Sequence, residues 1–359
     1  MRVLIVDDSV VFRTSISTAL SAVPGIEVAG TAANGEIALQ KLAKGSIDLI
    51  TLDMEMPGLN GIDVLKEIKR CGYDVKVIVF SSQTPRGADA ALNALREGAH
   101  DVVAKPSGDQ TSFDHAAESI RSALLPKIQQ FITDDTKQVL RTTIDRDSKK
   151  STPSIENDVL QPEKKDLSKF RPTAVVVGCS TGGPAALEDI FSKLTPPSRV
   201  PILIVQHMPP VFTAVLAKRL SELSGMPAAE AVDGEPVLPG RIYIAPGDYH
   251  MMVTGTRDAP LITLNKNPQR NYVRPAVDYL FESAAELWGA SLLGYVLTGM
   301  GEDGLQGAKA IRNKGGGIVI QDEESCVVFG MPGAIFRANS YDSVLPLKVM
   351  SMNLQKAIL

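Results

Sequence analysis

The sequence predicts an α/β protein with two domains, each built on a mostly parallel β-sheet. Three observations support this prediction. The chain has 359 residues, which is enough for two domains of ordinary size. Short apolar runs alternate along most of the chain with segments whose apolar residues recur at helical spacing. Between about 133 and 171 this alternation stops in a polar, charged stretch with too few apolar side chains to form a core. We therefore expect a linker over 133–171.

The first domain is expected over residues 1–132. Strands are predicted where apolar runs occur, at 3–6, 26–30, 47–53, 75–82 and 100–106. Helical patterns separate them, and such alternation is typical of a five-stranded parallel (βα)5 sheet with helices on both faces. Ligands bind such sheets at the carboxyl ends of the strands, so the residues that follow each run are candidates for a site.

The second domain is expected over residues 172–359. Apolar runs predict strands at 173–178, 200–206, 240–246, 250–255, 260–265, 292–298 and 316–322. Helical spacing predicts helices at 184–194, 211–224, 276–288 and 304–314. The runs between 240 and 265 are joined by turn residues, so we expect antiparallel hairpins there, beside a mostly parallel sheet.

Composition excludes several classes of function. The net charge of −4, without a basic stripe, argues against nucleic-acid binding. No apolar run approaches the ~18 residues of a membrane span, and the first apolar run meets Asp7 and Asp8 at once, unlike a signal peptide. Three scattered cysteines do not form a disulfide framework. We expect a cytoplasmic protein without membrane insertion.

Charged and hydroxyl side chains follow four strands of the first domain. Asp7 and Asp8 end the first predicted strand, Asp53 the third, Ser81 the fourth and Lys105 the fifth. Three carboxylates at one sheet edge repel each other unless a cation holds them, and oxygen ligands of this kind suit Mg²⁺. A carboxylate can also accept a phosphoryl group, whose oxygens Lys105 and Ser81 could bind. Each residue alone could merely cap a helix or occupy a turn.

A glycine-rich turn opens the second domain. Gly178-Cys179-Ser180-Thr181-Gly182 fits G-x-S-x-G, which exposes a serine hydroxyl between a strand and a helix. The helix N-terminus would offer N–H groups to an oxyanion. Such a turn could instead hold a phosphate, but G-x-G-x-x-G and G-x-x-x-x-G-K-[ST] are both absent.

A serine nucleophile needs a base and a carboxylate that orients it. His207 follows an apolar strand and is preferred to His250, which lies between two strands. Asp303, in the glycine-rich turn after the run at 292–298, is the preferred acid. The weaker candidates are Asp248, Asp278 and Asp322. The order Ser-His-Asp disfavours the α/β-hydrolase fold, where the acid precedes the histidine.

The first constellation, with "DMEMPGLNG" at 53–61, resembles the response-regulator receiver domain over residues 1–131. The resemblance implies that Asp53 is the phosphoacceptor and that a histidine kinase is the phosphodonor. It implies Mg²⁺ at Asp7, Asp8 and Asp53, with the backbone carbonyl of Glu55, and phosphoryl binding by Ser81 and Lys105. Val102 departs from the family, which often has an aromatic ring there, so the ring switch is not expected.

The second constellation resembles the chemotaxis protein-glutamate methylesterases over about 172–340. "GCSTGGP", "QHMPP" and "TGMGEDG" carry the match, and "IAPGDYHM" and "RPAVDYLF" extend it. The resemblance implies Ser180 as nucleophile, His207 as general base and acid, and Asp303 as orienting carboxylate. It implies oxyanion donors at the Thr181 and Met300 amides. The implied substrates are glutamyl methyl esters and glutamines of methyl-accepting chemoreceptors. The esterase would need no cofactor, and phosphorylation would activate it.

Two positions depart from that family, Cys179 and Glu302, where small and amide residues are usual. Cys179 raises a rival nucleophile, although the turn presents its third residue and not its second. The sequence is also compatible with a receiver fused to a non-catalytic binding output, and with the same enzyme in a non-flagellar chemosensory pathway. A transcriptional regulator is disfavoured, because no helix-turn-helix pattern occurs.

Overall fold

The computed structural model describes residues 1–21, 23–106, 113–132 and 163–359. The chain divides into two compact units, Met1–Leu160 and Gln161–Leu359, each with its own hydrophobic core. Most of the predicted linker, 133–162, lies outside the described residues. In the part of the chain that the structure covers, no helix has both the length and the apolar character of a membrane span.

The first unit is a five-stranded parallel sheet in the order β2-β1-β3-β4-β5. Helices α1 and α5 contact each other on one face, and α2, α3 and α4 follow one another on the other. The elements are β1 (Arg2–Val6), α1 (Val10–Ser21), β2 (Glu27–Ala32), α2 (Gly35–Leu42), β3 (Leu49–Asp53), α3 (Gly61–Cys71), β4 (Lys76–Ser81), α4 (Pro85–Glu97), β5 (Asp101–Ala104) and α5 (Phe113–Gln129). Strands β1 and β3 are almost fully buried, as expected of a sheet covered on both faces.

The second unit has a seven-stranded parallel sheet in the order β14-β13-β12-β6-β7-β9-β8. Its elements before the hairpin are β6 (Ala174–Cys179), α7 (Gly183–Phe191), β7 (Ile202–Gln206), α8 (Phe212–Ser224), β8 (Ala228–Glu230) and β9 (Ile242–Ile244). The antiparallel pair β10 (His250–Thr256) and β11 (Ala259–Asn265) follows, and β10 contacts α9 (Val277–Trp288). After the short 3-10 turn η1 (Gly289–Ser291), the chain continues as β12 (Leu292–Val296), α10 (Leu305–Asn313), β13 (Gly317–Gln321), α11 (Met331–Arg337), β14 (Ser343–Leu345) and α12 (Leu347–Ile358).

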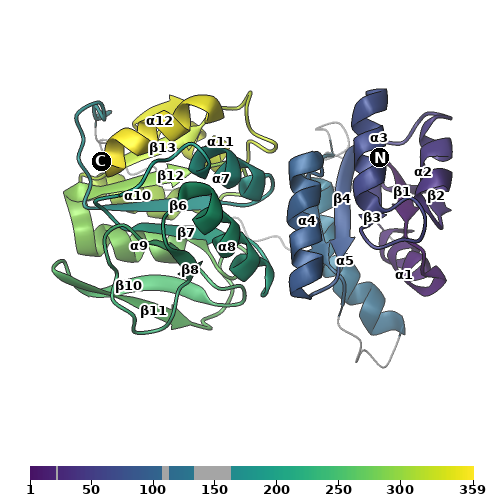
Figure 1. Ribbon diagram of the computed structural model, residues 1–359, viewed down its shortest axis with the longest axis horizontal. Helices are drawn as coiled ribbons and strands as arrows, with labels where there is room; N and C mark the ends of the chain where they lie inside the picture. The colour runs from purple at the N-terminus through teal and green to yellow at the C-terminus, as the bar shows by residue number, and fades with distance from the viewer. Residues whose placement is uncertain (22, 107–112, 133–162) are drawn as a thin grey trace, which may run out of the picture. The chain divides into compact units, whose positions relative to one another are not determined.

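Figure 1 shows the strands of this sheet with helices on both sides. Helices α7, α8 and α12 pack on one face, and α9 and α10 on the other. The close approach of α9 to β6 requires glycine, because a Cβ on Gly178 would lie 2.5 Å from a methyl carbon of Val277. This contact places the start of α9 beside the carboxyl end of β6.

The predicted fold class is confirmed, with one correction. The run at 240–246 does not join an antiparallel hairpin. Its strand β9 pairs parallel with β7 and β8 in the large sheet, and the hairpin contains β10 and β11 alone. Apolar side chains at 242–244 are buried on both faces of the sheet, which suits a parallel position.

Residues 163–171 fall within the predicted linker but contact the second unit. The Glu163 carbonyl accepts a hydrogen bond from Arg312 at 2.9 Å, and the Lys165 amide donates to Asp342 at 2.9 Å. A Cβ on Gly317 would lie 2.7 Å from Leu167, so this part of the chain lies directly on the start of β13.

Candidate functional site

The carboxyl ends of three neighbouring strands form the candidate active site. Strand β6 lies between β12 and β7, and Cys179 pairs with Gln206 in register. Ser180 and His207 are each the next residue after that pair, on adjacent strands. On the other side, the Ser180 amide donates to the carbonyl of Thr298, at the end of β12 (3.0 Å). Parallel pairing therefore brings the serine between the histidine and the glycine-rich turn at 299–304.

The backbone at Ser180 forms a sharp turn that depends on small residues. Gly182 has φ +77°, and a Cβ there would lie 2.6 Å from a Val327 methyl group. A Cβ on Gly183 would overlap the Gln206 side-chain oxygen. The Gln206 amide in turn donates to the Ser180 carbonyl at 2.9 Å. These contacts fix the turn and leave Ser180 partly exposed at its tip.

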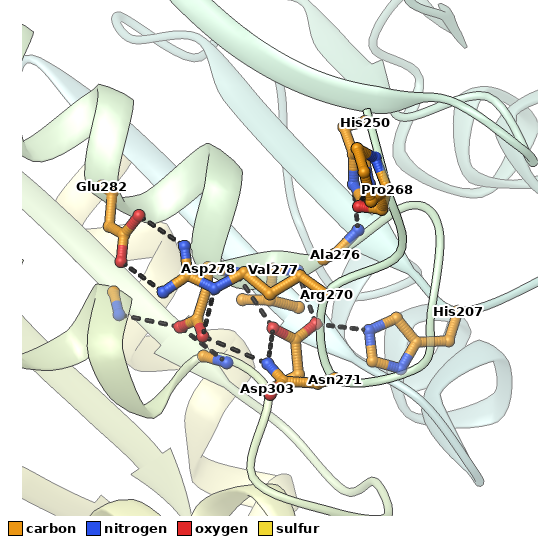
Figure 2. A network of polar contacts seen from close by, with 12 residues as sticks. His207, His250, Pro268, Arg270, Asn271, Ala276, Val277, Asp278, Glu282 and Asp303 are labelled. Atoms are coloured by element: carbon orange, nitrogen blue, oxygen red, sulfur yellow. Dashed lines mark hydrogen bonds and ion pairs between the residues drawn. The ribbon is translucent and has the colours of Figure 1, made fainter. Parts of the chain in front are cut away.

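His207 and Asp303 are in direct contact, as Figure 2 shows: His207 Nε2 lies 2.8 Å from Asp303 Oδ2. Both side chains are largely shielded, with exposed fractions of 10% and 2%. Because a carboxylate only accepts hydrogen bonds, we assign the proton of neutral His207 to Nε2. Its Nδ1 atom is then the basic nitrogen.

Asp303 also lies at the N-terminus of α9. Its carboxylate accepts from the amides of Val277 at 2.6 Å and Asp278 at 3.1 Å, and from the Asn271 side chain at 2.9 Å. Burial alone raises the pKa of Asp303. The hydrogen bond and charge of His207 and the two helix amides outweigh burial and hold this pKa below its ordinary value. Asp303 is therefore ionised at neutral pH.

A second buried carboxylate, Asp278, lies in α9 and caps the other helix, α10. It accepts from the amides of Gly304 at 3.0 Å and Gly307 at 2.8 Å, at the start of α10. Thus Asp303, just before α10, caps α9, and Asp278, in α9, caps α10. Asn271 donates to both carboxylates, and Arg270 lies 3.4 Å from Asp278 (Figure 2). Burial, followed by the charge of Asp303, raises the pKa of Asp278.

His250 and Cys179 take no part in the contact between His207 and Asp303. His250 is fully buried, accepts from the Ala276 amide at Nδ1 and contacts the Pro268 carbonyl through Nε2, which fixes the segment before α9. Burial lowers its pKa. Cys179 is also fully buried, and burial raises the pKa of its thiol, which disfavours the reactive thiolate. Asp248 binds Arg274, and Asp322 binds Ser325.

The remaining predicted residues lie around the turn. Thr181 is buried, Met300 is half-buried and Glu302 is exposed. Within the described residues, the Met300 amide has no hydrogen-bond acceptor. This amide is therefore an available hydrogen-bond donor at the turn.

The first unit brings its predicted residues together at the sheet edge. One oxygen from each of Asp7, Asp8 and Asp53 lies within 4.8 Å of the others. Lys105 Nζ donates to Asp7 at 2.9 Å and forms an ion pair with Asp53 Oδ2 at 2.7 Å. Burial, opposed by Lys105, raises the pKa of Asp53 to about 6, and the charge of Asp7 adds to this effect. A crowded set of carboxylate oxygens with a raised pKa fits a divalent cation.

Two other predicted residues of this edge have local partners. The Ser81 hydroxyl donates to the Gly87 carbonyl at 2.7 Å, and the Glu55 amide donates to Asp53 at 3.2 Å. Val102 is buried in β5.

Comparison with known proteins agrees with this geometry. Residues 175–354 match the CheB methylesterase family, and residues 3–117 match the response regulator receiver domain. A protein-glutamate methylesterase/protein-glutamine glutaminase of Trichodesmium erythraeum is 42% identical, over 99% of both chains. The chain is a member of the CheB methylesterase family.

Two further relatives extend the comparison. A family member from Pyrococcus horikoshii with the same description is 38% identical, over 100% of this chain and 94% of the relative. The crystal structure of the Thermotoga maritima CheB methylesterase catalytic domain matches with a TM-score of 0.50 and 42% identity. It covers 52% of this chain and 99% of that domain. The resemblance seen in the sequence is thereby confirmed at the level of the family and its hydrolase class.

Three residues of the site are not predicted, or not correctly placed, by the sequence. Gln206 could have been found from the sequence, because it is a polar residue at the end of an apolar strand. Asp278 is predicted only as a weaker candidate for the acid, whereas it caps α10. Asn271 lies in a polar loop without any pattern that indicates its contact with Asp303.

Proposed function

We propose that the second unit hydrolyses glutamyl methyl esters of chemoreceptors through Ser180, His207 and Asp303, and deamidates receptor glutamines by the same route. The observation that carries this proposal is the contact between His207 and the ionised Asp303. His207 follows β7, the strand that pairs with the strand before Ser180. The contact supplies an oriented base at the place where the turn exposes a hydroxyl.

In the first step Ser180 Oγ attacks the ester carbonyl carbon, and its proton passes to His207 Nδ1. Asp303 stabilises the imidazolium that results. The amides of Thr181 and Met300 are proposed to donate to the oxyanion. The C–O bond then breaks, and methanol leaves with the proton from His207. Water, activated by the same histidine, hydrolyses the acyl-enzyme and restores Ser180.

The first unit is proposed to control this reaction. A chemotaxis histidine kinase would transfer a phosphoryl group to Asp53, and phosphorylation would activate the esterase. Asp7, Asp8 and Asp53, with the Glu55 carbonyl, would hold Mg²⁺, which neutralises the charge that gathers there during transfer. Lys105 and Ser81 would bind the phosphoryl oxygens. We propose a cytoplasmic location, which the free cysteines support.

One assay tests both parts. Methanol release from a methyl-esterified receptor is compared for the intact chain with and without acetyl phosphate and Mg²⁺. Ser180→Ala should lower kcat by about 10⁶-fold, whereas Cys179→Ala should keep most of the activity. Loss of activity in the cysteine variant alone would overturn the serine assignment. Equal rates with and without acetyl phosphate would overturn control by Asp53.

A further inference from the structure

A two-residue turn beside the catalytic acid has an unusual composition. Arg270 and Val273 form an antiparallel bridge, and each donates its amide to the carbonyl of the other, at 3.3 and 3.1 Å. The two central residues both have positive φ, +53° at Asn271 and +62° at Tyr272. Turns of this kind prefer Asn-Gly, because glycine adopts positive φ without steric cost. The second position is filled here by a bulky tyrosine.

The two central side chains have opposite surroundings. Asn271 donates to Asp303 at 2.9 Å and to Asp278 at 3.2 Å, so it belongs to the buried network of Figure 2. Tyr272, the next residue, is 95% exposed. Within the described residues its side chain makes no hydrogen bond and no ring contact, so it is not packed into the fold.

The turn is nevertheless held firmly on both sides by arginines. Arg270 makes a two-pronged contact with Glu282, at 2.6 and 2.7 Å. Arg274 binds Asp248 through two nitrogens, at 3.0 and 2.7 Å, and donates to the carbonyls of Lys266 and Asn267. An exposed aromatic side chain on a rigid support loses little conformational entropy when it binds a partner.

We propose that Tyr272 is a specificity-determining residue that packs against the polypeptide segment carrying the esterified glutamate. The proposal rests on the proposed function. It adds the residue by which the enzyme prefers a glutamyl ester within a polypeptide to a small-molecule ester. Asn271 contacts Asp303, and Asp303 contacts His207, so the turn lies two side-chain contacts away from the proposed base. A tyrosine offers a polypeptide substrate a large apolar face and one hydroxyl, at a position where the fold itself favours glycine.

Tyr272→Gly is a sharp test, because it creates the preferred Asn-Gly turn and so does not weaken folding. With a methyl-esterified receptor fragment, KM should rise roughly tenfold while kcat changes little, as for the loss of one aromatic anchor. With a small ester, N-acetylglutamate γ-methyl ester, kcat/KM should be unchanged. Tyr272→Phe should stay close to the wild type on both substrates. Asn339→Gly, at another left-handed position (φ +49°), is the matched control.

The outcomes separate this inference from the proposed function. If the intact wild-type chain releases methanol from the receptor fragment and Tyr272→Gly does so with the same KM, the role of Tyr272 is refuted. Equal losses on the protein and the small ester would also refute it, because they would indicate a disturbed triad. If the wild type releases no methanol from the fragment, the proposed function fails instead.

Discussion

The segment that follows His207 has a strained backbone at one residue. Val211 has φ +74° at the start of α8, a conformation that a β-branched side chain rarely adopts. A close contact holds it there, because even a Cβ on Gly247 would overlap the backbone of Pro210. The turn that follows β7 is thus tightly packed at Pro210, and the next residue, Val211, has the strained backbone.

Val211→Gly should therefore stabilise the second unit. Relief of the left-handed strain is worth about 1–2 kcal/mol, and the greater entropy of glycine in the unfolded chain offsets about 0.5–1 kcal/mol. Denaturant titration should show a midpoint slightly above that of the wild type. Val215→Gly, in the interior of the same helix, is the control and should lower the midpoint. A lower midpoint in both variants would show that Val211 is not strained.

Helices α9 and α10 depend on each other through their first turns. Each helix is capped by a carboxylate that belongs to, or directly precedes, the other helix. If the helices separated, the backbone N–H groups at the start of each helix would lose the carboxylate that accepts their hydrogen bonds. Asp303, the proposed catalytic acid, is therefore also a structural cap, and the orientation of its carboxylate depends on the position of α9.

Asp278→Ala should weaken this pair and the site together. The variant loses the cap of α10 and one of the two ionic partners of Arg270, the other being Glu282, so we expect about 3 kcal/mol less stability. The rate of methanol release should fall because Asp303 lies just before α10, and the Asp278 side chain holds the start of α10 against α9. Glu286→Ala on the same helix removes only an exposed ion pair with Lys314 and should change stability by less than about 0.5 kcal/mol. Thermal unfolding of both variants measures the difference, and equal effects would contradict the reciprocal caps.

The elements also show what a sequence can and cannot predict. Long apolar runs identify the central strands, because those strands are buried on both faces. Strands β8 and β14 escape prediction, since each has only three half-buried residues. Helices α11 and α12 are not predicted either. The sequence predicts Ser180, His207 and Asp303 as one site because each follows a predicted strand, and the structure places His207 in contact with Asp303. The contacts of Asn271 and Asp278 depend on the approach of α9 to α10, which no local pattern specifies.

The two units have separate hydrophobic cores. When a charge is changed in one unit, the stability of the other unit therefore serves as the reference. Asp53 is 2% exposed, and its pKa is raised to about 6. Its ionised form is therefore less favourable in the folded unit than in the unfolded chain. The resulting loss of stability is complete above pH 6, shrinks as the pH falls, and vanishes below about 3.8.

Asp53→Asn should thus stabilise the first unit at pH 7.5 without Mg²⁺ by about 1–2 kcal/mol. This gain is smaller than the raised pKa of Asp53 alone would give, because the variant also loses the ion pair with Lys105. At pH 4.5 the gain should be much smaller, and Mg²⁺ should stabilise only the wild type. Hydrogen exchange of the β1 and β3 amides in the intact chain measures this, and the β6 and β12 amides are the internal control. An equal gain at both pH values would contradict the raised pKa.

The shortness of β8 and β14 has a consequence for the behaviour of the chain at high concentration. They are the two outer strands of the seven-stranded sheet, so the unpaired backbone groups along its rims belong to them. Three residues offer too few hydrogen bonds for a strand of another molecule to add stably. The minimal outer strands therefore protect the seven-stranded sheet against edge-to-edge aggregation.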